Sequence, residues 1–88
     1  MDWQWLLLAR YQGQPIIRAE VVCSDYFCPL TFKAWKEMVH DGTIHLPIMR
    51  MSPSKKAPLY VSINHLADFL AKREAAAAKE AAALNTLR

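Results

Sequence analysis

Pro29 constrains this chain more than any other residue, because it lies between two segments that both favour a helix. The first, from Arg18 to about Phe27, must end there, since proline lacks a backbone N–H and clashes with the preceding helical turn. Thr31 is a good N-cap for the second, which we expect over 32–41. One apolar stripe on this second helix is formed by Phe32, Trp35, Met38 and Val39. The sequence therefore predicts two helices joined by a tight turn.

Shorter elements are predicted before this pair. Residues 2–10 favour a short helix with Asp2 as its N-terminal cap and Gly13 as its C-terminal one. Residues 15–17 are β-branched and bounded by Gly13 and Pro15, which favours a brief strand.

The pattern changes from helical to alternating after Gly42, which we expect to end the second helix in the left-handed conformation. Alternating apolar residues predict a strand over 44–50, and Pro47 within it indicates an edge strand. A second strand is predicted over 59–63. Between the two strands lies the wing loop, residues 52–58, which is polar and basic. The pair therefore forms a hairpin with a cationic tip.

The chain ends in a helix that we expect Asn64 to cap, with Leu66, Phe69 and Leu70 facing the core. We divide the chain into a domain over 1–71 and an alanine-rich helix over 72–88 that projects from it, because alanine favours helix and buries little. The candidate residues for pairing with a second copy along this helix are Leu70, Ala77, Leu84 and Leu87. The alternative is a solvated tail.

The positive charge is concentrated in the middle third of the chain. Residues 31–58 hold five Lys or Arg and two acids, whereas the rest holds six of each, so the net charge of +3 arises in the middle. Such a local field attracts polyanions. The alternative is a solvated surface that keeps the protein in solution.

Size and composition disfavour several classes of function. An 88-residue chain allows one domain with little room for a catalytic pocket, and no catalytic constellation or phosphate-binding glycine loop is present. We expect neither an enzyme nor a cofactor. No apolar run could span a bilayer and no secretory signal begins the chain, so we expect a cytoplasmic, nucleoid-associated protein with no membrane partner.

A zinc site is the main rival interpretation. The spacing Cys23-x4-Cys28-x11-His40-x4-His45 nearly matches a Cys2His2 zinc finger. Gly42, however, ends the helix between the two histidines, which must project from one helical face to share a metal. We therefore expect no metal.

The order of elements predicts an α+β fold, a winged helix-turn-helix of the MerR and excisionase type with an extended C-terminal helix. The helix 32–41 would enter the major groove of DNA, and the wing loop would lie on the backbone or in the minor groove. The candidate DNA-binding residues are Thr31, Lys33, Lys36, His40, Arg50, Ser52, Ser54, Lys55 and Lys56.

Several short motifs are similar to one known family. They are Asp25-Tyr26-Phe27, Leu30-Thr31, Gly42-x-Ile44-x-Leu46-Pro47-x-x-Arg50-Met51, Ser54-x-Lys56-Ala57 and Leu66-Ala67-Asp68-Phe69-Leu70. The chain resembles the pyocin activator protein PrtN family, small DNA-acting proteins of prophages and phage-tail-like bacteriocin clusters, from about Leu7 to Lys72. It departs from the family pattern at Lys55, where glutamine is expected, and at His65, where an acid is expected.

The resemblance implies a prophage-encoded transcriptional activator that binds double-stranded DNA. We expect self-association on DNA and contact with RNA polymerase or an integrase. The layout is also similar to phage excisionases, which bind repeated sites cooperatively and bend DNA, so that function remains an alternative. A third possibility is a protein-interaction module, such as an antirepressor that uses the C-terminal helix.

Overall fold

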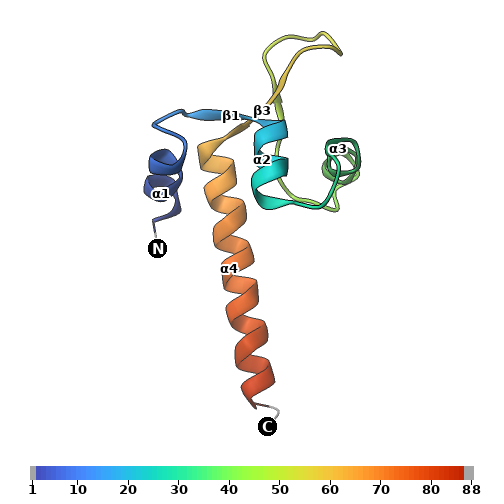
Figure 1. The fold of residues 1–88 in the computed structure, drawn as a ribbon. Helices are drawn as coiled ribbons and strands as arrows, with labels where there is room; N and C mark the ends of the chain where they lie inside the picture. The colour runs from blue at the N-terminus through green and yellow to red at the C-terminus, as the bar shows by residue number, and fades with distance from the viewer. Residues whose placement is uncertain (1, 87–88) are drawn as a thin grey trace.

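The computed structural model describes residues 2–86, which form helices and short strands (Figure 1). In chain order the elements are α1 (Trp3–Arg10), β1 (Ile16–Arg18), α2 (Ala19–Tyr26), α3 (Phe32–His40), β2 (Met49–Arg50), β3 (Leu59–Ser62) and α4 (Ile63–Thr86). The loop between β2 and β3 projects from one end of the molecule and α4 extends from the other. The predicted α+β class is confirmed.

Helices α2 and α3 form the predicted helix-turn-helix. The turn contains Pro29, and the N–H of Leu30 donates to the carbonyl of Phe27 at 2.8 Å. The hydroxyl of Thr31 accepts a hydrogen bond from the backbone N–H of Ala34 at 3.2 Å, which confirms Thr31 as the N-cap of α3. At the other end of α3, Gly42 has the predicted left-handed conformation, with φ of +88°.

The predicted N-cap of α1, Asp2, is confirmed, whereas the C-cap residue is Tyr11, two residues before the predicted Gly13. The Asp2 carboxylate accepts from the N–H of Trp5 at 3.3 Å. Beyond the last turn, Gly13 adopts a φ of +79° and its N–H donates to the carbonyl of Leu8 at 2.7 Å.

Three strands form one antiparallel sheet in the order β1-β3-β2. Ile17 pairs with Val61 in the first ladder and Met49 with Tyr60 in the second. In the central strand Leu59 and Val61 are buried, whereas Tyr60 and Ser62 are half-buried, as alternation predicted. Strands β2 and β3 with the wing loop form the wing that follows the helix-turn-helix.

The predicted strand over 44–50 is wrong in length, because only Met49–Arg50 pairs as β2. The N–H of Ile44 donates to the carbonyl of Met38 at 3.1 Å, and Pro47 has no N–H to offer to a ladder. Ile44 and Leu46 are nevertheless buried. The alternating apolar pattern therefore reflects the burial of Ile44 and Leu46, not their pairing in a strand.

The predicted capping of α4 by Asn64 is also wrong. Strand β3 runs directly into α4, so the cap position comes earlier, and the hydroxyl of Ser62 accepts from the N–H of His65 at 3.0 Å. The carboxamide oxygen of Asn64 instead accepts from the side chain of Gln4 on α1 at 2.7 Å.

The core lies where α2, α3, the sheet and the first turns of α4 meet. Its largest fully buried side chains are Trp35, Leu46, Leu66, Val22 and Val61. The Phe27 ring joins α3 to α4, with its centroid 5.5 Å from that of Trp35 and 5.6 Å from that of Phe69. Beyond Leu70, residues 71–85 are exposed apart from half-buried Ala76. The division of the chain at 71/72 stays a prediction.

Candidate nucleic-acid interface

One face of α3 carries four charged or titratable side chains. They are Lys33, Lys36, Glu37 and His40, which lie three or four residues apart and therefore share a face, and all four are exposed. Burial of Trp35 against the core turns this face outward. The ammonium of Lys36 lies 5.4 Å from the centroid of the Phe32 ring, a cation–π distance.

The wing supplies the second group of candidate residues. Arg50 is exposed on β2, and in the wing loop Ser52, Lys55 and Lys56 are exposed. The hydroxyl of Ser54 accepts from the backbone N–H of Lys56 at 3.2 Å, and its carbonyl accepts from that of Ala57 at 3.1 Å. These two hydrogen bonds form a turn, and the side chains of Lys55 and Lys56 in this turn are exposed to solvent.

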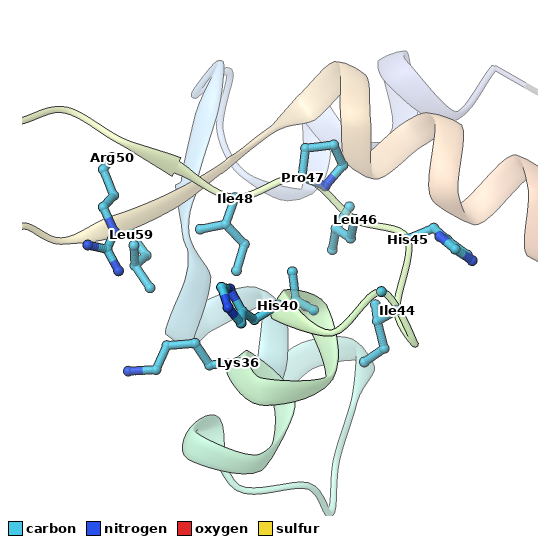
Figure 2. Close-up of a pocket in the computed structure, with 11 residues that line it drawn as sticks. Lys36, His40, Ile44, His45, Leu46, Pro47, Ile48, Arg50 and Leu59 are labelled. Atoms are coloured by element: carbon cyan, nitrogen blue, oxygen red, sulfur yellow. The ribbon is translucent and has the colours of Figure 1, made fainter. Parts of the chain in front are cut away.

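Helix α3 and the base of the wing enclose a groove with a volume of about 750 Å³. Figure 2 shows Ile48, Arg50 and Leu59 on one side of it and Lys36 and His40 of α3 on the other. The fold thus brings together three of the predicted DNA-binding residues: Lys36, His40 and Arg50. The remaining candidates, Thr31, Lys33, Ser52, Ser54, Lys55 and Lys56, do not line the groove.

The apolar residues of the groove were missed as site residues. They include Ile44, Leu46, Pro47, Ile48 and Leu59. The alternation over 44–50 was the sequence signal for Ile44, Leu46 and Ile48, but a strand interpretation placed these three in a hairpin instead of against α3. Leu59 does belong to the hairpin, as the first residue of β3. His45 also lines the groove, although its ring points away from Lys36 and His40 in Figure 2.

The groove is cationic without an acid of its own, because no Asp or Glu lines it. Within residues 2–86, no ion pair involves Lys33, Lys36, Arg50 or the wing-loop lysines. Asp41, at the end of α3, accepts from the N–H of Thr43 at 2.9 Å and from its hydroxyl at 2.6 Å. These bonds to the charged form lower the pKa of Asp41.

The zinc interpretation gains no support from the structure. Residues 2–86 contain no group of three or more His, Cys, Asp or Glu side chains that could hold a metal ion. Cys23 is buried within α2, and burial raises the pKa of its thiol, whereas Cys28 is exposed in the turn.

The candidate self-association residues occupy different environments along α4. Leu70 is half-buried and packs against the core, whereas Ala77 and Leu84 are exposed. Leu87 lies outside the described residues. None of the helices formed by residues 2–86 combines the length and the apolar character needed to cross a membrane.

A family model described as pyocin activator protein PrtN matches residues 5–77, which include the helix-turn-helix, the groove and the wing. The chain belongs to the pyocin activator protein PrtN family. This family is regulatory, not a class of enzymes, and membership points to transcription regulation in a prophage. The comparisons with curated proteins and with solved structures found no match.

Proposed function

We propose that this protein is a prophage transcriptional activator that binds double-stranded DNA through α3 and the wing. The observation that carries the proposal is the convergence of Lys36 and His40 from α3 with Arg50 from β2 around one acid-free groove. Cations that form no ion pair within residues 2–86 are available to phosphates, which dominate affinity for DNA. Family membership supplies the regulatory context.

In this proposal α3 lies in the major groove with Lys33 and Lys36 toward the bases or phosphates. Arg50 and the wing loop contact the backbone or the minor groove. The hydroxyls of Ser52 and Ser54 offer further donors to phosphate. No arginine lies on α3, so the commonest bidentate contact to guanine is missing from this helix and base specificity from one monomer is modest.

The exposed half of α4 supports self-association on DNA. Residues 71–85 are exposed and rich in alanine, which allows two helices to approach closely. Leu84, with 64% of its surface exposed, is the large apolar residue of this segment. Two copies joined here would read two sites, which compensates for modest specificity of one.

The test is the salt dependence of binding to duplex DNA, measured by fluorescence anisotropy with the full chain. Five phosphate-contacting bases predict a log–log salt slope of about −4 to −5 per monomer. Lys55→Gln with Lys56→Gln should reduce that slope by about 2, because each phosphate contact contributes about 0.9.

The matched control removes the same charge from α4, by Lys72→Gln with Lys79→Gln. It should leave the slope unchanged, and equal losses in the two double variants would contradict the assigned face. Leu84→Glu should convert cooperative binding into independent binding. Protected sites near a promoter with raised transcription support an activator, whereas direct repeats beside an attachment site with DNA bending would support an excisionase instead.

A further inference from the structure

We infer that the groove between α3 and the wing also binds a small amphiphilic anion, an apolar body that carries one carboxylate, sulfonate or phosphate. This class of ligand matches the groove, which has an apolar floor (Leu46, Ile48 and Leu59) and a rim of basic side chains (Lys36, His40 and Arg50). A second consequence rests on the proposed function: an occupied groove excludes DNA from the adjoining face of α3, so the ligand lowers DNA affinity.

The floor of the groove is apolar and already built. Leu46 and Leu59 are buried in it, and half-buried Ile48 extends toward α3 in Figure 2. Its volume of about 750 Å³ lies within the range of about 300–1,000 Å³ that small-molecule sites occupy. A hollow of this size accommodates a body of one or two aromatic rings or a short acyl chain.

Duplex DNA does not account for this floor. Duplex DNA presents backbone phosphates and the polar edges of its paired bases to a protein, with the thymine methyl as the main apolar group. Phosphate recognition requires only the exposed cations around the opening. The apolar surface below them therefore matches a different ligand, one with an apolar body small enough to enter.

The rim supplies the charge complementarity. Lys36 and Arg50 approach the groove from opposite walls, and His40 lies between them in Figure 2. Neither Lys36 nor Arg50 forms an ion pair within residues 2–86, and no acid lines the groove. An anionic head group can thus form charge-assisted hydrogen bonds without displacing an acidic partner.

The experiment compares two fluorescent probes on the full chain. One is 8-anilinonaphthalene-1-sulfonate, and the other is N-phenyl-1-naphthylamine, which has the same apolar body without the sulfonate. The anionic probe should bind at least about ten-fold more tightly, as expected for roughly one charge-assisted contact. Lys36→Gln with Arg50→Gln should abolish that preference but leave binding of the neutral probe unchanged.

Two further variants locate the probe and separate this inference from the proposed function. Ile48→Gln should weaken both probes at least five-fold while leaving the DNA salt slope unchanged, and a urea unfolding curve checks that it folds. Lys55→Gln with Lys56→Gln should weaken DNA binding but not probe binding. Equal affinity for the two probes, or full binding to Ile48→Gln, overturns the inference, because the probe then sits elsewhere, for example on exposed Trp5 and Leu6 of α1.

A final titration tests the regulatory consequence. Added duplex DNA should displace the anionic probe from the wild-type protein. If DNA binds while the probe stays bound, mutual exclusion is refuted. If DNA does not bind at all while the probe variants behave as expected, the proposed function fails and the ligand site stands.

Discussion

The charged side chains of α1, β1, α2 and the first three turns of α4 form ion pairs, whereas those of α3 and the wing form none within residues 2–86. On the first side, Arg10 lies 3.4 Å from Asp25, Arg18 lies 3.1 Å from Glu20, and Lys72 lies 3.8 Å from Asp68. Residues 31–58 take part in none of the ion pairs of the described chain.

Exposed ion pairs contribute little to stability, so the difference matters mainly for availability of charge. A lysine or arginine already paired with an acid must give up that partner before it can bind a phosphate. The cations of α3 and the wing have no such competition, and the net positive charge of the chain comes from the same region. The unpaired cations therefore lie on the side of the molecule that we propose binds an external anion.

Removal of Trp35 should have the largest effect, because this side chain holds α3 against the core. Its side chain is fully buried, and its ring packs against those of Phe27 and Phe32 at 5.5 and 5.8 Å. Trp35→Ala should lower the free energy of unfolding by about 3–5 kcal/mol, measured by urea denaturation. The matched variant Trp5→Ala, at a side chain that is 72% exposed, should change it by less than about 0.5 kcal/mol. Similar losses at both positions would contradict the core assignment.

Tyr11→Phe should have the next largest effect, because it removes a contact to one of the paired carboxylates, Asp25. The buried Tyr11 hydroxyl donates to the Asp25 carboxylate at 2.6 Å, which joins α1 to α2. Burial, reinforced by this bond, raises the pKa of Tyr11 above its ordinary value. Loss of the hydroxyl should cost about 1–2 kcal/mol, since it removes a hydrogen bond to a charged acceptor.

The corresponding control on the unpaired side is Lys36→Gln, which should change the free energy of unfolding by no more than about 0.5 kcal/mol. Chemical denaturation of Tyr11→Phe and of Lys36→Gln measures the difference between their free energies of unfolding. An equally large cost at Lys36 would mean that its charge has an internal role, and the distinction between the two sides would be lost.

The smallest expected effect is a shift in the pKa of Asp41. Its carboxylate accepts hydrogen bonds from Thr43 and forms no ion pair with a lysine or arginine within residues 2–86. Its pKa is lowered in the folded state, so the stability that it contributes is present above the unfolded value of about 3.9 and is lost as pH falls through the folded value. Thr43→Val should raise the Asp41 pKa toward its ordinary value in an NMR titration, while Lys36→Gln leaves it nearly unchanged. A pKa of Asp41 that shifts in Lys36→Gln but not in Thr43→Val would mean that Lys36 forms an ion pair with Asp41.

Much of the helical structure was predictable because its signals are local. Pro29, Thr31 and Gly42 act through their own backbone geometry and through neighbours within a few residues, and the observed turn, cap and left-handed residue agree with the sequence. Asn64 shows the limit of this reasoning. Its side chain suits a cap, yet the pairing of β3 with two other strands set where α4 begins, and Ser62 took that role.

The candidate site was predictable only in part. The excess of positive charge over residues 31–58, and the separation of Lys33, Lys36 and His40 from the apolar stripe of α3, follow from composition and helical periodicity alone. The sequence pattern could not show that residues 44–48 pack against α3 instead of pairing in a strand.

The ends of α3 and the face of this helix that carries the charges follow from the sequence, because both depend on interactions within one or two helical turns. The meeting of Arg50 of the wing with Lys36 and His40 of α3 around an apolar groove required the folded chain. That meeting depends on the antiparallel pairing of β2 with β3 and on burial of Ile44 and Leu46, which are contacts between residues distant in the chain.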